Sequence, residues 1–498
     1  MQESKVSRRL KESTAPEVNE YIYRPRLEGF ADGFLNLGNV NKAHIVMLAE
    51  QGLIRGEHAT ALARGVLDME AAGPAVVTLD PSREDAYFNY EAHLIEQIGT
   101  DVGGRLHTGR SRNDILATLD RLRCREVLMA LIDLLIQTRQ TALNNAEIFA
   151  EVVMPGYTHL QPAQPITYGY YLSAVEQALE RDCKRLTQTL ESMNQSPLGA
   201  AAFAGTPFDI DRARTAELLG FDGYLDNALD AVGSRDFILE SLSHLSLLSV
   251  FWSRVAQDYF VWSTHEFSLI DFPDSVAATS SIMPQKKNPT VLEYLKGRTG
   301  HIVGLLMAAS VTVKGSNFSH TGDANREGTR GFWEAAEESL RCLKLLELVL
   351  RTAIPNADLA VRRAGEDFST ATGLADLIVR EADLSFREAH HVVGAAATDY
   401  SAIGQVQKPV FTDVFGVHDP GVRARQGGLS EHFANPPARF TDGLSATIML
   451  AECAGRPTVW VRQHRMTLPQ FAACDGDEVV RFGNELVSDD GVGWADPD

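Results

Sequence analysis

The chain has 498 residues, with 46 Lys or Arg and 66 Asp or Glu, so its formal net charge is −20. Nucleic acids and anionic membranes bind basic surfaces, so this charge argues against both as partners. The length exceeds one typical core, and with 44% hydrophobic and 22% charged residues we expect a folded protein of two or three domains.

Long amphipathic helices dominate the pattern along the chain. Apolar residues recur at helical spacing in segments 126–154, 168–193, 237–263 and 332–350. These segments are longer than an average helix, and their wide apolar faces predict packing on more than one side. Alternating strand patterns are rare, although 459–461 is a candidate strand. We therefore predict an all-α fold with a central bundle of long helices.

Segments rich in Pro, Gly and charge separate the helices. Residues 161–165 and 274–289 are predicted loops, and 416–438 is predicted to be irregular. The final segment, 475–498, carries eight acidic residues and a single Arg. That composition predicts a solvated tail or a loosely packed appendage.

The cysteines and the N-terminus indicate the compartment. The five cysteines are far apart and never spaced CxxC, which is typical of reduced thiols: Cys124, Cys183, Cys342, Cys453 and Cys474. The N-terminus lacks the apolar stretch of a signal peptide, and no run of about 18 apolar residues occurs. We therefore expect a cytoplasmic protein without a membrane span.

Three polar clusters interrupt the helical pattern at the edges of predicted helices. They are HTGRSRND at 107–114, GYTHLQP at 156–162 and TSSIMPQKKNP at 279–289. Each cluster alone has a structural explanation, such as an exposed turn, a surface ion pair or an interior histidine. Together they combine Arg, Lys, Asn, Ser and Thr donors with a histidine, which suits carboxylate binding and proton transfer.

Other chemistries find no motif in the sequence. It contains no P-loop, no strand-borne GxGxxG, no HExxH and no GxSxG nucleophile elbow. His390 and His391 are adjacent rather than spaced as ligands on one helix face, so we expect no metal site.

The clusters resemble the three signature regions of the fumarase/aspartase superfamily. SSIMPQKKNP at 280–289 resembles the signature loop, and HTGRSRND and GYTHLQPAQP resemble the other regions in their argininosuccinate lyase forms. LDAVGSRDF at 229–237 is similar to the same branch. The resemblance extends from about residue 30 to about residue 350 and fades beyond about residue 438.

The resemblance implies a fold, an assembly and a reaction. The fold would be all-α in three domains: 1–115, a central helical bundle at 116–365, and 366–498 with the acidic tail. The expected assembly is a homotetramer joined through the bundle, with composite active sites built from three subunits. The reaction would be a reversible β-elimination that releases fumarate and needs no metal or other cofactor.

The resemblance also assigns roles to residues. Ser280 matches the general base, Lys286 would stabilise its alkoxide, and His159 would protonate or orient the departing nitrogen. The signature loop would close on the substrate. Other motif positions would bind the substrate: Ser111, Arg112, Asn113, Thr158, Ser281, Met283 and Asn288.

The sequence departs from argininosuccinate lyases where the amine half of the substrate should bind. His320, Asn325 and Gly328 stand where those enzymes usually have Tyr, Gln and Lys, and the last change removes a cation and should open space. Asn41 replaces a serine, and Thr279 replaces the glycine before the serine pair, which should stiffen the loop. The fumarate half of the site therefore matches the family and the arginine half does not.

These departures predict a carbon–nitrogen lyase for an N-substituted aspartate other than argininosuccinate. We expect ethylenediamine-N,N′-disuccinate, cleaved to fumarate and N-(2-aminoethyl)aspartate and then to ethylenediamine. Its second succinyl arm would bind near His320 and Asn325, with Arg326 or Arg330.

Three alternatives stay open. The chain could be an argininosuccinate lyase with unusual substitutions, or a lyase for another N-succinyl amine. It could also be a crystallin-like structural protein without activity. That last alternative predicts erosion of Ser280, His159 or Lys286, and all three residues are present.

Overall fold

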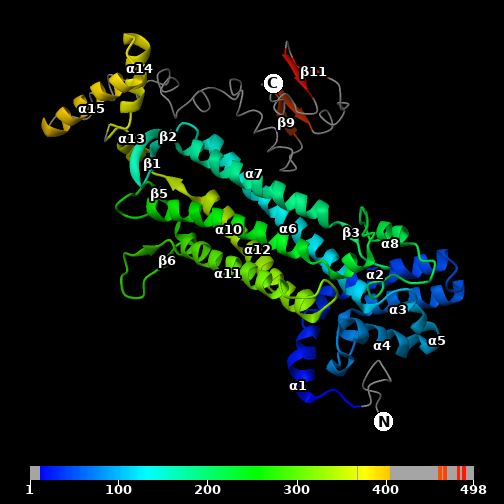
Figure 1. Ribbon diagram of the computed structural model, residues 1–498. Coiled ribbons are helices and arrows are strands. Elements are labelled where there is room, and N and C mark those ends of the chain that lie inside the picture. Colours follow the sequence, from blue (N-terminus) through cyan, green and yellow to red (C-terminus); the bar gives the residue numbers. More distant parts are fainter. Residues whose placement is uncertain are drawn as a thin grey trace. The chain divides into compact units, whose positions relative to one another are not determined.

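A computed structural model describes residues 12–366, 368–403, 458–461, 464–467, 479–482 and 485–488 (Figure 1). The chain divides into two compact units. Unit 1 comprises Met1–Ala130, Leu186–Ser243 and Leu305–Glu334, and unit 2 comprises Leu131–Arg185, His244–Gly304 and Ala335–Asp498. The three domains expected from the sequence are a different division of the chain and stay a prediction.

Long helices dominate the structure, which confirms the predicted all-α class. Five long helices each have residues in both units: α6 (Arg112–Ile148), α7 (Tyr168–Met193), α10 (Asp236–Trp262), α11 (Thr290–Val313) and α12 (Gly328–Thr352). The prediction that the first of these helices continues to residue 154 was wrong. The helix ends at Ile148, and Met154 lies in a strand instead.

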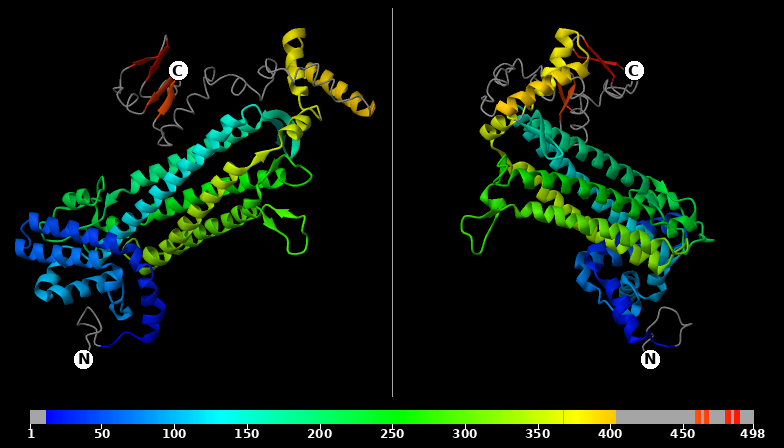
Figure 2. Two further views of the ribbon diagram at one scale, coloured as in Figure 1. Left: turned by 180° about the vertical axis from the view of Figure 1, so that it is seen from behind. Right: turned by 60° about the vertical axis from the view of Figure 1, so that its left-hand side comes forward.

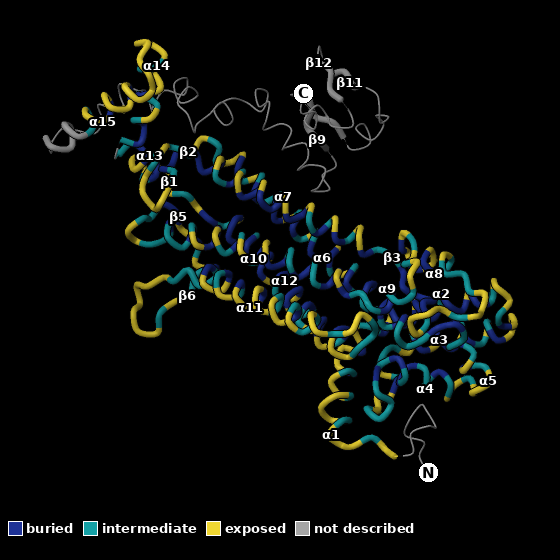
Figure 3. Tube along the Cα trace, in the orientation of Figure 1, coloured by how far each residue is buried: buried dark blue, intermediate teal, exposed yellow. Residues whose placement is uncertain are grey.

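Within unit 2, buried residues recur along the long helices, between exposed and intermediate ones (Figure 3). Arg139 of α6 forms an ion pair of 2.9 Å with Glu176 of α7, and both side chains are fully buried. The indole of Trp252 on α10 donates to the carbonyl of Leu295 on α11 at 3.2 Å. Removing one partner of a buried ion pair such as Arg139–Glu176 costs about 3–5 kcal/mol. This ion pair and the Trp252 hydrogen bond therefore fix which helix faces meet.

Unit 1 is built around shorter helices. They are α1 (Pro16–Val18), α2 (Phe30–Glu50), α3 (Gly56–Ala72), α4 (Ala86–Ile98), α5 (Thr100–Gly103), α8 (Arg212–Leu218) and α9 (Ala228–Gly233). Single turns of 3-10 helix separate them at η2 (Arg24–Leu27), η3 (Pro74–Val76), η4 (Pro81–Arg83) and η5 (Gly104–His107). Two π-helical turns, η1 (Asn19–Tyr23) and η7 (Asp323–Glu327), complete the unit.

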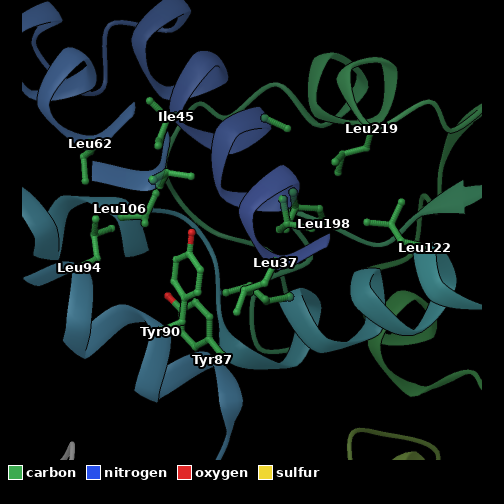
Figure 4. Close-up of a cluster of buried hydrophobic side chains, with 14 of the residues drawn as sticks. Leu37, Ile45, Leu62, Tyr87, Tyr90, Leu94, Leu106, Leu122, Leu198 and Leu219 are labelled. Carbon is green, nitrogen blue, oxygen red and sulfur yellow. The ribbon is translucent and has the colours of Figure 1, made fainter. Parts of the chain in front are cut away.

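The core of unit 1 fixes the start of α4 and includes Leu106, which directly precedes the first polar cluster. Figure 4 shows Tyr87 and Tyr90 of α4 among leucines that include Leu94 and Leu106. All four side chains are fully buried, and burial of each such side chain stabilises the fold by about 2 kcal/mol. Asp85 caps α4, since its carboxylate accepts the N–H of Phe88 at 3.1 Å. The chain around Asp85 is therefore fixed by both packing and capping.

A short strand pair replaces the predicted loop at 161–165, and another closes the predicted loop at 274–289. β1 (Val153–Thr158) pairs with β2 (Gln161–Thr167), and β6 (Ala278–Thr279) pairs with β7 (Lys287–Asn288), both antiparallel. The prediction of a loop at 161–165 was wrong, because a strand in a two-stranded ribbon has a free edge where proline needs no partner. Views from opposite sides show both hairpins at the same end of unit 2 (Figures 1 and 2).

The remaining elements are short. β3 (Gln195–Ser196) pairs with β4 (Gly223–Tyr224), and β5 (Ile270–Asp271) pairs with β8 (Ile354–Pro355). The turn η6 (Asp274–Val276) precedes β6. Three helices follow β8: α13 (Ala357–Ala364), α14 (Ala371–Ala382) and α15 (Phe386–Ile403).

The C-terminal segment contains two described hairpins. β9 (Thr458–Val461), which confirms the predicted strand, pairs with β10 (His464–Thr467), and β11 (Val479–Phe482) pairs with β12 (Glu485–Ser488). The acidic segment 475–498 therefore holds a strand pair that its composition did not predict. The segment predicted to be irregular, 416–438, lies outside the described residues, as do Cys453 and Cys474.

Two further observations concern the described residues alone. Cys124, Cys183 and Cys342 are buried. No helix in this part of the chain is long and apolar enough to cross a membrane.

Candidate active site

The third polar cluster forms an exposed loop in unit 2. Thr279 pairs with Lys287, and Ala278 with Asn288, so residues 280–286 are closed by a two-pair hairpin. Asn288 adds a bond from its amide nitrogen to the carbonyl of Thr279 at 3.4 Å. Thr279 lies in the strand, where a β-branched residue fits well and no glycine is needed. Ser281 and Met283 project from the loop into solvent.

The hydroxyl of Ser280 lies against the loop backbone. Its Oγ accepts the N–H of Met283 at 3.1 Å and that of Ile282 at 3.4 Å. The N–H of Lys286 donates to the carbonyl of Met283 at 3.1 Å, which keeps this turn compact. Backbone N–H groups at a serine oxygen are the donors that would stabilise its deprotonated form.

The two lysines of the loop have different surroundings. The Lys287 ammonium forms ion pairs with Asp271 at 3.2 Å and Asp274 at 3.3 Å. Lys286 is exposed and has no ion-pair partner within the described chain. Lys286 is therefore the loop cation that is available to a ligand.

His159 lies at the tip of the β1–β2 hairpin, also in unit 2. Thr158 pairs with Gln161, which leaves His159 and Leu160 as a two-residue turn with φ of 55° and 59°. Positive φ at both central residues is the condition of a type I′ turn, and it costs a non-glycine residue roughly 1–2 kcal/mol. Thr158 and His159 are exposed, and in the described chain no hydrogen bond joins His159 to the 280–286 loop.

The first polar cluster begins α6 in unit 1. The carbonyl of Ser111 accepts the N–H of Ile115 at 3.2 Å, so Ser111 starts the helix. The Arg112 guanidinium lies 2.7 Å from Glu84 and 3.2 Å from Asp85. The amide nitrogen of Asn113 donates to the carbonyl of Ala202 at 3.0 Å.

A group of arginines in unit 1 surrounds the predicted amine half of the site. Arg326 of η7 lies 3.4 Å from the Asp85 carboxylate that Arg112 also contacts, and Arg235 lies 3.3 Å from Asp120. We call this group the arginine cluster, and its members are Arg26, Arg112, Arg235, Arg326, Glu84, Asp85 and Asp120. Its four guanidiniums exceed its three carboxylates by one positive charge.

His320 and Asn325 lie beside this cluster. Burial, followed by the charges of all four arginines, lowers the pKa of His320 to about 4, so the imidazole is neutral at pH 7. Asn325 is only 5% exposed, and its side-chain oxygen and nitrogen have no partners among the described residues. Guanidiniums, a neutral imidazole and an unpaired buried amide suit a carboxylate better than a second guanidinium.

The structure contradicts one expectation about the amine half, for Gly328, and places Asn41 and the two candidate arginines. Gly328 does not open space, because a Cβ there would lie 2.5 Å from Cγ2 of Val313. Asn41 is buried and accepts a bond of 2.6 Å from Arg110. Of the two candidate arginines, Arg326 belongs to the arginine cluster, whereas Arg330 is exposed on α12.

The predicted site residues thus fall into two groups. Unit 1 holds Ser111, Arg112, Asn113, His320 and Asn325, and unit 2 holds Thr158, His159, Ser280, Ser281, Met283, Lys286 and Asn288. The sequence did not single out Asp85, Asp120 or Arg26. Ion pairs with partners distant along the chain reveal Asp85 and Asp120, and its charge effect on His320 reveals Arg26. In the described chain, no group of three His, Cys, Asp or Glu residues could hold a metal ion.

Known proteins share this sequence and fold. A lyase family model matches residues 39–304, and an argininosuccinate lyase C-terminal model matches residues 368–406. Argininosuccinate lyase 1 of Shouchella clausii is 42% identical over 386 residues, which cover 77% of this chain and 78% of that protein. The crystal structure of EDDS lyase in complex with formate is similar with a TM-score of 0.70 and 29% identity, and covers 84% of this chain and 82% of that one. A variant of EDDS lyase with bound fumarate is similar with a TM-score of 0.67 and 28% identity, over 84% and 82% of the two chains.

Proposed function

The chain belongs to the fumarase/aspartase superfamily, in its argininosuccinate lyase branch, and on that premise we propose that it releases fumarate from an N-substituted aspartate. The enzyme class, carbon–nitrogen lyase, is common to these relatives. The proposal concerns the substrate and the residues that act on it.

The proposed reaction breaks one C–H and one C–N bond. Ser280 Oγ, as an alkoxide held by the N–H groups of Met283 and Ile282, takes the proton from the carbon beside a carboxylate. The electron pair moves into that carboxylate, and Lys286 stabilises the resulting dianion. The pair then forms the fumarate double bond as the C–N bond breaks, and His159 protonates or orients the departing amine. Every step uses side chains of this protein.

We propose that the departing amine carries a second succinyl arm, with two carboxylates and no guanidinium, as in ethylenediamine-N,N′-disuccinate. The observation that carries this proposal is the arginine cluster around the neutral His320. A guanidinium ligand would meet an excess of positive charge there, whereas a carboxylate would meet cationic donors. The likeness to EDDS lyase supports the same substrate class.

Competing substrates test the proposal directly. The purified protein is incubated with ethylenediamine-N,N′-disuccinate or argininosuccinate, and fumarate is measured by its ultraviolet absorbance. We expect the disuccinate to give the larger kcat/KM. Faster turnover of argininosuccinate would refute the assignment of the amine.

A matched pair of arginine variants locates the specificity. Arg326→Gln removes a guanidinium of the cluster, whereas Arg330→Gln removes an exposed one on the next helix. We expect Arg326→Gln to raise KM for the disuccinate at least tenfold, because a buried charged donor is lost. Arg330→Gln should stay within about twofold of the parent. Equal effects of both changes would contradict a carboxylate site at Arg326.

Argininosuccinate lyase activity is the second candidate, and the 42% identity to enzymes of that name favours it. The substrate comparison decides between the two candidates. A structural protein without activity is the third, and Ser280→Ala tests it. We expect this change to abolish fumarate release, and an unchanged rate would refute Ser280 as the base.

We also propose the homotetramer with composite sites and the three-domain division at 1–115, 116–365 and 366–498. Exposed apolar side chains in unit 2 support an assembly: Leu247 and Val250 on α10, and Tyr294 and Val303 on α11. Solvent-exposed apolar groups of this number on bundle helices are typical of surfaces that another subunit covers. Light scattering should give four times the mass of one chain, and a monomer at micromolar concentration would refute the assembly.

A further inference from the structure

Asp114 is a buried carboxylate in unit 1 that the proposed reaction does not use. It lies in the first turn of α6 and is fully buried. One oxygen accepts the N–H of Ser111 at 2.9 Å, and the other accepts the N–H groups of Gly199 at 2.9 Å and Ala201 at 2.8 Å. A single side chain thus joins the first polar cluster to a segment about 85 residues further along.

The segment 199–202 adopts a backbone that turns its N–H groups toward Asp114. Gly199 has φ of 84°, and Ala201 has φ of 55°, which is costly for a residue with a Cβ. A Cβ at Gly199 would lie 2.8 Å from both Arg212 Cγ and Ile210 Cδ1, so only glycine fits. The three hydrogen bonds to the carboxylate offset this cost, since bonds to a charged acceptor are about twice as strong as neutral ones.

The same segment orients Asn113. Its amide nitrogen donates to the carbonyl of Ala202 at 3.0 Å, and Ala202 directly follows the residue that Asp114 holds. A carbonyl can only accept, so the amide nitrogen must face Ala202 and the amide oxygen must face away from it. Asp114, Ala201, Ala202 and Asn113 therefore form a closed ring of contacts.

We propose that Asp114 is a positioning residue for substrate binding, which acts by holding the 199–202 segment and through it the amide of Asn113. The second N–H of the Asn113 amide nitrogen is then fixed as a donor for a carboxylate of the ligand, a group that both the substrate and fumarate carry. This inference rests on the proposed function, because it assumes that Asn113 contacts the substrate.

Protonation of Asp114 should break this arrangement. Burial raises the pKa of Asp114 to about 6. The hydrogen bonds from Ser111 and Ala201, the charge of Arg110 and the hydrogen bond from Gly199 lower the pKa by less than burial raises it. The other charged group that acts on it is Arg212 of α8. Between about pH 5 and pH 8, the carboxylate of Asp114 is the group of this arrangement that changes charge. A protonated oxygen would place a donor against backbone donors.

The test compares Asp114→Asn with Asp211→Asn in the full-length protein. Asp211 also accepts a backbone N–H, that of Arg214 at 2.8 Å, but only as the N-cap of α8, where Asn serves equally well. Fumarate affinity is measured by calorimetry, and kcat and KM for fumarate release are measured from about pH 5.5 to pH 8.

We expect Asp114→Asn to raise KM and the fumarate Kd at least tenfold, with kcat within about threefold. The parent and Asp211→Asn should lose fumarate affinity as the pH falls through about 6. The fumarate affinity of Asp114→Asn should not change in this pH range. Unchanged affinity in Asp114→Asn, or an equal loss in Asp211→Asn, would overturn the proposal.

The parent protein supplies a second measurement if Asp114→Asn fails to fold. A fumarate Kd that stays constant from about pH 5.5 to pH 8 would overturn the role of Asp114, and a rise in Kd on acidification through about pH 6 would support it. A parent that binds no fumarate at any pH would refute the proposed function, and the role of Asp114 with it. The two failures are therefore distinguishable.

Discussion

Lys286 and Lys287 are neighbours in the 280–286 loop and its closing strand, yet only one is available to a ligand. Two aspartates hold Lys287, and Lys286 has no ion-pair partner in the described chain. We predict that Lys286→Ala lowers kcat for fumarate release by about 10²–10³, because a donor to the developing dianion is lost. Steady-state kinetics with the disuccinate measure this effect.

Lys287→Ala is the matched control for that prediction. Its loss removes two ion pairs with exposed aspartates, each of which contributes about 0–1 kcal/mol to stability, and should leave kcat within about threefold. A larger loss of kcat in Lys287→Ala than in Lys286→Ala would show that the loop uses the other lysine.

His320 should make folding stability depend on pH. Its pKa is lowered to about 4 by burial and by the four arginines, from an ordinary value of 6.5. The unfolded chain therefore binds a proton more readily than the folded chain, so stability is complete above pH 6.5 and is lost as the pH falls from 6.5 through 4. We predict that His320→Gln flattens the decline of the urea midpoint across this range.

The control for this prediction is His93, which is half-buried on α4 and forms a hydrogen bond with Gln97. His93→Gln should leave the pH dependence of the urea midpoint as it is in the parent. A parent midpoint that stays level from pH 6.5 to pH 4 would contradict the buried, neutral state of His320.

At the residue scale, motif letters predicted the identity of candidate groups but not their partners. Ser280, Lys286 and Arg112 could be selected because the spacing around them is local. Asp85 could not be selected, because it gains its importance from Arg326, which lies 241 residues away. A sequence without a fold gives no reason to pair these two residues.

At the scale of elements, periodicity predicted helices where one apolar face is continuous. α7 has the predicted bounds, and α10 begins one residue before the predicted start. α11 was not predicted, since three glycines interrupt its pattern and apolar residues such as Tyr294 and Val303 are exposed. The β1–β2 hairpin was not predicted because its prolines suggested a loop.

The junction of η7 and α12 offers a test of packing at this scale. Gly328 starts α12, and a Cβ there would lie 2.5 Å from Val313 Cγ2 and 3.3 Å from the carbonyl of Asp323. We predict that Gly328→Ala lowers the free energy of unfolding by about 1–3 kcal/mol through overpacking. Urea unfolding followed by circular dichroism measures it.

Gly322 provides the matched control, because it precedes η7 with helical φ and a Cβ there would have open space around it in the described chain. Gly322→Ala should be neutral or stabilising by up to about 1 kcal/mol, since alanine restricts the unfolded chain. Equal destabilisation by both changes would show that a side chain anywhere in this segment is unfavourable, and that the contact with Val313 is not the cause.

At the scale of the whole molecule, the net charge of −20 opposes the binding of a polycarboxylate. About a third of that charge, −7, lies in the segment 475–498, outside the region that matches the lyase family. Under the proposed function, attraction would come from local positive groups such as the arginine cluster and Lys286. The attraction by nearby charges acts at short range, whereas the repulsion by the net charge acts at long range. Added salt screens the long-range repulsion more strongly, so the salt dependence of binding distinguishes the two effects.

Raising the ionic strength from about 20 mM to about 150 mM shortens the screening length to about 8 Å. The repulsion between the acidic molecule and the substrate acts at long range and should weaken, whereas contacts with partly buried guanidiniums should change little. We predict that kcat/KM for the disuccinate stays constant or rises by up to about threefold over this range. A chloride series and a sulfate series at equal ionic strength separate screening from competition by anions at the arginine cluster, since only sulfate should compete strongly. A steep fall of kcat/KM in both series would mean that long-range attraction steers the substrate, and that the excess negative charge is screened or turned away from the site.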